Sequence, residues 1–165
     1  MYGIMFGCFI PLHQGHIALI NRAIKENDKV ILGVCGYDDD RGKDFIPFRT
    51  RFELVKNKFK NNPNVTVVLM DDKKMGLTGT FSTEAWTIWG KELFEQAKVD
   101  PNVGNFTWYT GEANYAEKLK EVYPNHRVIY VPREEDGLSG TKIRNNPKKY
   151  AGFIDQDFSN YLKGE

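Results

Sequence analysis

The sequence predicts an α/β fold, a Rossmann-like doubly wound parallel sheet of five strands flanked by helices. Short runs rich in β-branched and aromatic residues alternate with longer runs of helical spacing along the whole chain. Such alternation implies parallel strands joined by right-handed crossovers. A chain of 165 residues can bury a core without disulfides or metals. We therefore expect a single domain over residues 1–165, with no kinase domain and no DNA-binding domain.

The elements of the N-terminal half follow from these patterns in order. Residues 2–9 form an apolar run that predicts the first strand, and residues 14–25 carry isoleucines at helical spacing. Residues 29–37 are rich in Val and Ile and predict the second strand. Residues 48–59 have aromatic and aliphatic residues on one helical face. The β-branched run at residues 65–70 suits a strand that is buried on both faces of the sheet.

The C-terminal half continues the alternation. Residues 83–97 are helical because two tryptophans and a leucine recur at spacings of three and four. Residues 106–110 predict the fourth strand, 113–122 a short helix and 128–131 the fifth strand. Residues 139–144 look like a helix start capped by a serine, and a proline soon afterwards limits its length. We expect a last short amphipathic segment to follow.

Charge and composition limit the classes of molecule that the chain is expected to bind. The chain has 23 basic and 22 acidic residues and a formal net charge of +1, which disfavours a general nucleic-acid or membrane surface. Only Cys8 and Cys35 are cysteines, which indicates reduced thiols in a cytosolic protein. The chain lacks a signal-like start and any apolar run of about 20 residues. We expect a cytoplasmic protein that acts on small molecules.

The segment from Gly7 to His16 connects the first strand to the first helix. Gly7 and Gly15 leave room for a phosphate to approach backbone amides, and a helix N-terminus carries partial positive charge. His13 and His16 lie three residues apart at this turn, where their ring N–H groups could reach phosphate oxygens. A metal site made of Cys8, His13 and His16 is an alternative, although no fourth ligand is evident. The pattern favours a phosphate site.

This segment, written GxFxPxHxGH, resembles the first signature of the nucleotidyltransferase superfamily with the HxGH motif. Residues 138–144 (LSGTKIR) are similar to its second signature, a helix start that ends in arginine; plain helix capping by Ser139 is the alternative. Within the superfamily, the chain resembles the nicotinamide mononucleotide adenylyltransferase domain of NadR-type proteins over about residues 3–154. The stretches that carry this likeness are Gly36-Tyr37-Asp38-Asp39 with Arg41, Trp86-Thr87-Ile88-Trp89, Tyr109-Thr110 with Glu112, and Arg144-Asn145-Asn146-Pro147 with Tyr150.

The resemblance implies a reaction and a set of residues. The reaction is transfer of AMP from ATP to nicotinamide mononucleotide, which gives NAD and pyrophosphate. It implies His13, His16 and Arg144 as catalytic residues, with His16 at the α-phosphate and Arg144 at the leaving pyrophosphate. The implied ATP-binding set is Gly7, Phe9, His13, Gly15, His16, Arg133, Ser139, Gly140, Thr141 and Arg144. Mg²⁺ would accompany the ATP phosphates without assigned protein ligands, and relatives of this type commonly form homo-oligomers.

The implied mononucleotide-binding residues are Phe9, Arg51, Trp86, Trp89 and Tyr109. Nicotinamide is a flat cationic ring that binds aromatic faces, so Trp89, followed by Trp86, is the expected platform. The alternative for two tryptophans at helical spacing is a place in the core, and the alternative for Arg51 is an exposed helix face.

One departure from the family concerns Cys8, which stands where relatives commonly carry Lys or Arg. The phosphate cation expected at that position is therefore missing. Two alternatives to the proposed reaction stay open. One is another HxGH nucleotidyltransferase, acting on phosphopantetheine or transferring CMP, and the other is a non-catalytic nucleotide sensor.

Overall fold

The computed structural model describes residues 1–132 and 138–164 and has a five-stranded, fully parallel sheet. The strand order is β3-β2-β1-β4-β5, so the predicted doubly wound α/β class is confirmed. Apolar residues that face both sides of the sheet stabilise these strands, as expected for a parallel sheet covered on both faces. The strands are β1 (Tyr2–Gly7), β2 (Lys29–Gly36), β3 (Val65–Asp71), β4 (Phe106–Thr110) and β5 (Arg127–Tyr130).

The strand order reverses at β1. Here β1 pairs with β2 on one side, with Gly7 opposite Val34, and with β4 on the other, with Met5 opposite Tyr109. The connections that leave β1 and β4 therefore diverge to opposite faces of the sheet. Such a switch point opens a crevice at the carboxyl ends of the strands, where ligands of this fold class bind.

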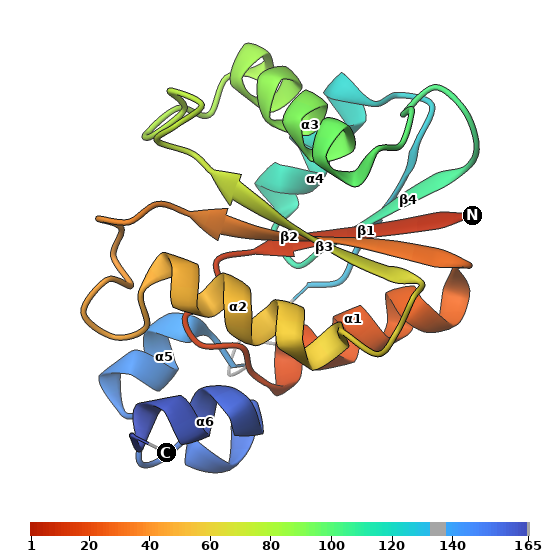
Figure 1. Ribbon diagram of the computed structural model, residues 1–165. Coiled ribbons are helices and arrows are strands. Elements are labelled where there is room, and N and C mark those ends of the chain that lie inside the picture. Colours follow the sequence, from red (N-terminus) through yellow and green to blue (C-terminus); the bar gives the residue numbers. More distant parts are fainter. Residues whose placement is uncertain (133–137, 165) are drawn as a thin grey trace.

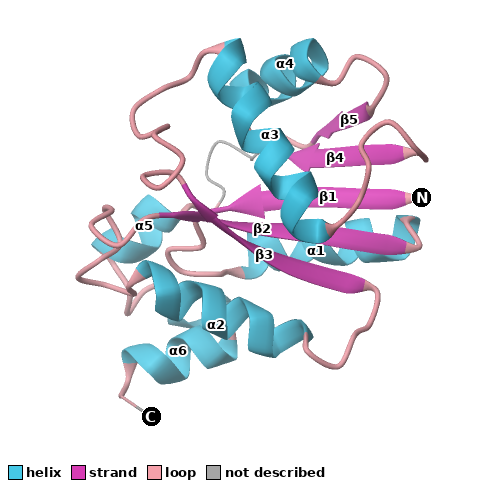
Figure 2. Ribbon diagram, turned by 45° about the horizontal axis from the view of Figure 1, so that its top comes forward, coloured by secondary structure: helices cyan, strands magenta, loops and turns pink. Residues whose placement is uncertain are grey.

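Helices cover both faces of the sheet. Figure 1 shows α3 and α4 on one face and α1 and α2 on the other, while α6 packs against α2. The arrowheads of all strands point to the same edge in Figure 2, and α5 lies at that edge. Among the described residues, no helix combines the length and apolarity needed to cross a membrane. The helices are α1 (Gln14–Glu26), α2 (Phe48–Phe59), α3 (Thr83–Ala97), α4 (Ala113–Val122), α5 (Gly140–Asn145) and α6 (Gln156–Leu162).

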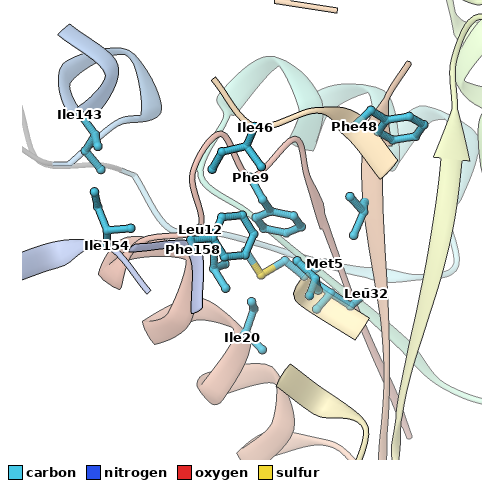
Figure 3. Packing of buried hydrophobic residues seen from close by; sticks show 12 residues of the cluster. Met5, Phe9, Leu12, Ile20, Leu32, Ile46, Phe48, Ile143, Ile154 and Phe158 are labelled. Carbon is cyan, nitrogen blue, oxygen red and sulfur yellow. The ribbon is translucent and has the colours of Figure 1, made fainter. Parts of the chain in front are cut away.

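Two main cores lie on opposite sides of the sheet, and a smaller cluster of Ala23, Val30 and Tyr109 accompanies them. The first joins the sheet to α1, α2, α5 and α6 and includes Phe9, Leu12, Ile143 and Phe158, all essentially inaccessible to solvent (Figure 3). The second lies under α3 and α4 and is rich in aromatic rings. Because α5 and α6 contribute to the first core, burial of their side chains fixes the C-terminal segment beside the loop that follows β1.

The structure shortens the first strand relative to the sequence-based expectation. β1 ends at Gly7, and Phe9 takes a left-handed backbone conformation with a φ of 54°. This conformation is unfavourable for a non-glycine residue, and complete burial of the Phe9 side chain offsets its cost. The last segment divides into a 3₁₀ turn (Ala151–Phe153) and α6, with Asp155 capping the helix.

Candidate active site

A cavity of about 900 Å³ lies at the carboxyl edge of the sheet, within the range of roughly 300–1,000 Å³ usual for small-molecule sites. Its walls come from β1 and the loop after it, the first turn of α1, α3, α4 and the start of α5. Polar groups gather where α1 and α5 begin, and aromatic rings gather under α3. The cavity is therefore a single cleft with two chemically different ends.

The two histidines of the first motif cap helix α1 with their side chains. His13 is the N-cap residue, and its Nδ1 accepts a hydrogen bond from the Gly15 backbone N–H at 3.1 Å. The His16 Nδ1 accepts one from the His13 backbone N–H at 3.3 Å. A ring nitrogen that accepts a hydrogen bond carries no proton, so in both neutral rings the proton is on Nε2. The backbone thereby selects the tautomer of each imidazole.

Close packing holds these rings at the cleft. The His13 and His16 rings stack with centroids 3.8 Å apart, and the edge of Phe9 meets the His16 ring at 4.9 Å. A side chain at Gly15 would place its Cβ 2.9 Å from His13 Cε1, so only glycine lets the imidazole lie against the backbone at this position. The backbone of His13 also bridges to Ile154 near the C-terminus.

The start of α5 joins the same loop from the other end of the sequence. Arg144 Nη1 donates a hydrogen bond to the Ile10 carbonyl oxygen at 2.8 Å, and Nη2 donates to Thr141 Oγ1 at 3.3 Å. Ser139 caps α5 by accepting from the Lys142 N–H at 3.1 Å. A Cβ on Gly140 would lie 2.9 Å from the Ile10 oxygen, so glycine permits this close approach. The two sequence signatures therefore form one wall of the cleft.

Positive charge concentrates at this wall. Burial lowers the pKa of Arg144, and the neighbouring Arg41 guanidinium lowers it further. Arg41 also lines the cleft. Burial raises the pKa of the Cys8 thiol, an effect that Arg41 and Arg51 oppose; the thiol therefore stays neutral at physiological pH. Two guanidinium groups close enough to perturb each other favour an anionic ligand.

The aromatic end of the cleft is formed by five rings, of which Trp86 occupies the centre. Trp86 is half-buried and lies 5.2 Å from Tyr115, 5.6 Å from Phe81 and 5.8 Å from Phe6 between ring centroids. Trp89 is only 8% exposed and packs against Phe6 at 4.7 Å. Both tryptophans line the cleft. Trp86 is the more exposed of the two, whereas the sequence favoured Trp89 as the expected platform.

Two residues expected to bind the mononucleotide point elsewhere. Arg51 is completely buried, pairs with Asp40, and donates to the Cys8 carbonyl at 2.8 Å and the Ile46 carbonyl at 2.9 Å. Burial is the largest influence on the pKa of Asp40 and raises it, but the hydrogen bond and charge of Arg51, together with the backbone N–H groups of Tyr37 and Gly42, outweigh burial and lower the pKa. The sequence suggested that Arg51 either contacts a phosphate or lies on an exposed helix face. Instead, Arg51 forms a buried ion pair, because its helix packs onto the sheet.

Tyr109 is the second such residue. Its ring is 2% exposed, and its hydroxyl donates to Glu26 at 3.0 Å and accepts from Asn27 at 2.9 Å. Both partners lie at the C-terminal end of α1, remote from the two histidines at its start. Tyr109 reaches the cleft wall at the end of β4, but its polar atom is engaged on the other side. The expected ATP contact Arg133 lies outside the described residues.

Several lining residues were not expected from the sequence. Those with charged or aromatic side chains include Phe6, Arg22, Arg41, Asp72, Phe81 and Tyr115. The sequence offered a reason to consider Arg41, because it belongs to the polar segment after the second strand. The other residues come from positions with no motif. Their role is decided by which strand and helix ends meet at the cleft.

The described residues contain no group of three or more His, Cys, Asp or Glu side chains that could hold a metal ion. The alternative metal site made of Cys8, His13 and His16 is therefore not formed. Cys8 and Cys35 are both free thiols.

Comparison with known proteins assigns the family. The sequence pattern described as cytidylyltransferase-like matches residues 4–146, which include both signatures. The chain belongs to this family of nucleotidyltransferases. It is 28% identical, over 92% of its length, to the trifunctional NAD biosynthesis/regulator protein NadR of Escherichia coli (strain K12). It is 27% identical, over 96% of its length, to a probable nicotinate-nucleotide adenylyltransferase of Fusobacterium nucleatum, and covers 95% of that protein.

A solved structure shows the same fold. The crystal structure of NadR protein in complex with NR superposes with a TM-score of 0.79 at 31% identity, over 95% of this chain and 44% of that chain. This chain spans 38% of the length of the Escherichia coli relative. The similarity to NadR proteins therefore concerns one part of those proteins.

Proposed function

We propose that this chain is a nicotinamide mononucleotide adenylyltransferase, which converts nicotinamide mononucleotide and ATP into NAD and pyrophosphate. One observation carries the proposal: a single cleft at the switch point joins a phosphate-directed wall to an aromatic end. The reaction needs both, because it unites two polyanions and one of them carries a flat cationic ring. We propose that residues 1–165 act as one nucleotidyltransferase domain.

The chemistry requires positioning and charge stabilisation rather than a base. An oxygen of the mononucleotide phosphate, already anionic at neutral pH, attacks the α-phosphorus of ATP. The bond from that phosphorus to the bridging oxygen breaks, and the electron pair leaves with pyrophosphate. Negative charge grows on the equatorial oxygens in the in-line transition state. We assign the Nε2–H of His16 to the α-phosphate and that of His13 to the phosphates generally.

The leaving pyrophosphate needs compensating cations. We assign Arg144 to it, since its guanidinium is fixed by Ile10 and Thr141 at the cleft wall. Arg41 supplies the positive charge that Cys8 does not. The hydroxyl groups of Ser139 and Thr141 and the backbone of Gly7, Phe9, Gly15 and Gly140 complete the proposed ATP contacts, with Arg133 as a further candidate.

We place the nicotinamide ring against Trp86, with Trp89 beneath it. Stacking and cation–π attraction contribute about 0.5–2 kcal/mol. Arg51 and the Tyr109 hydroxyl are left out of the mononucleotide site, because their polar atoms are engaged in the interior. Phe9 contributes its backbone and the support of His16. Mg²⁺ would arrive on the ATP phosphates, and no step proposed here uses a metal ligand from the protein.

A direct assay tests the proposal. Purified protein is incubated with ATP, Mg²⁺ and nicotinamide mononucleotide, and NAD is measured by chromatography. Parallel reactions replace the mononucleotide with phosphopantetheine, or ATP with CTP and a small phosphate acceptor. NAD formation that is lost in a His16→Asn variant supports the proposal. Activity only in a parallel reaction would assign another member of the family, and nucleotide binding without any product would assign a sensor.

A further inference from the structure

Asp72 lines the cleft and takes no part in the proposed transfer step. It directly follows β3, where Met70 lies opposite Cys35 of β2. The charge of Asp72 raises the pKa of the Cys8 and Cys35 thiols, so its carboxylate lies on the face of the sheet where Cys35 and Met70 pack with Trp89. Asp72 lines the cleft together with Trp86 and Trp89.

The backbone fixes Asp72 on both sides. Its N–H donates to the Gly36 carbonyl at 3.0 Å, and its carbonyl accepts from the Leu77 N–H at 2.8 Å. Its carboxylate, in contrast, makes no hydrogen bond or ion pair with any residue in the described ranges 1–132 and 138–164. Burial raises the pKa of Asp72 to about 6, helped by the charges of Asp71 and Asp40. At neutral pH it is thus an anion without a counter-charge.

A half-buried anion of this kind favours ligands that bring a donor or a positive charge and disfavours ligands that bring a second anion. The two mononucleotides that an enzyme of this class meets differ at one group only. Nicotinamide mononucleotide has a cationic ring with a neutral carboxamide, whose N–H can donate. Nicotinate mononucleotide has a carboxylate in that place. Asp72 and Trp86 line the same cleft, so a ring stacked on Trp86 carries this group into the cavity that Asp72 faces.

We propose that Asp72 is a specificity-determining residue, which accepts a hydrogen bond from the nicotinamide carboxamide and repels the nicotinate carboxylate. The inference rests on the proposed function and deepens it. The chain would therefore select the amide over the acid by charge. A hydrogen bond to a charged group contributes about 1.5–3 kcal/mol, which corresponds to roughly 10–100-fold in kcat/KM.

The test compares kcat/KM for the two mononucleotides in three proteins at pH 7.5. Wild type should prefer nicotinamide mononucleotide by at least about tenfold. Asp72→Asn keeps the shape and removes the charge, so the ratio of amide to acid should fall by about tenfold or more. Asp71→Asn is the matched control: it removes the same charge one residue earlier, on the opposite face, where Asp71 accepts from the Lys74 N–H at 3.1 Å. The control should keep the wild-type ratio.

Each outcome decides between the claims. An active wild type whose ratio is unchanged in Asp72→Asn overturns the role of Asp72 and leaves the proposed function standing. An equal change of the ratio in Asp71→Asn also overturns the role of Asp72, because a general effect of negative charge would then explain the selectivity. A wild type that makes neither dinucleotide overturns the proposed function, and this inference with it. Asp72→Ser provides a second variant if the asparagine variant does not fold.

Discussion

We assign a different task to each of the two ring nitrogens of His16. Nδ1 accepts from the His13 backbone N–H at 3.3 Å and so caps α1, while the proton on Nε2 is assigned to the α-phosphate. His16→Ala removes both. Loss of one preorganised donor to a transition-state oxyanion costs about 10²–10³ in kcat. The long cap bond falls at the lower end of capping energies, about 0.5–1 kcal/mol, so Tm should fall by only about 1–4 °C.

Two further variants separate the tasks. His16→Asn places an amide oxygen near the position of Nδ1 but does not reach that of Nε2, so it should keep Tm and lose kcat as in His16→Ala. His16→Gln places an N–H near the Nε2 position and should recover part of kcat. Steady-state kinetics with saturating substrates and differential scanning calorimetry provide the two readouts. If His16→Asn keeps kcat within about threefold of wild type, far below the loss expected for such a donor, the assigned role is refuted.

Three other predictions follow from the same contacts. Trp86→Ala should raise KM for the mononucleotide about 2–30-fold with little change in Tm, whereas Trp89→Ala should mainly lower stability by about 3–5 kcal/mol; similar effects of both on KM would contradict this division. Burial lowers the pKa of His126, whose Nδ1 accepts from Trp108 Nε1 at 3.0 Å. The unfolded chain therefore binds the proton first, and the free energy of unfolding should decrease as pH falls below about 6.5; urea titrations from pH 8 to 5 measure it, and a His126→Gln variant should lose this part of the slope. Arg51→Met leaves a buried carboxylate without its partner and should cost about 3–5 kcal/mol of stability, measured by the same titrations; a mild stability loss with a large rise in KM would return Arg51 to the substrate site.

The capping arrangement shows how far a motif specifies a site. The spacing of His13 and His16 and the glycine between them predicted a phosphate site at a strand–helix turn. The structure adds the direction of each ring, since the backbone N–H groups of His13 and Gly15 engage both Nδ1 atoms. Backbone hydrogen bonds of this kind depend on the φ and ψ angles of the turn, which a list of residues does not contain.

Arg51 and Tyr109 show the limit of the same reasoning. Both have residue types suited to a phosphate or a ring, yet α2 packs Arg51 against Asp40, and β4 turns the Tyr109 hydroxyl toward the end of α1. Which face of an element reaches the cleft depends on register and packing. A shift of one position along a strand reverses the face, so such assignments need coordinates.

The sequence by itself determined the fold class, the order of the elements and the two signatures that form one wall of the cleft, because periodicity and turn residues are local properties. Tertiary structure alone decided that β1 lies between β2 and β4, and thus that the His13 loop and the α5 start meet. It also brought Arg41 and Asp72 to the cleft and left Trp86 more exposed than Trp89. These relations join residues far apart in the chain, and burial of the two cores, which no local pattern encodes, sets their distances.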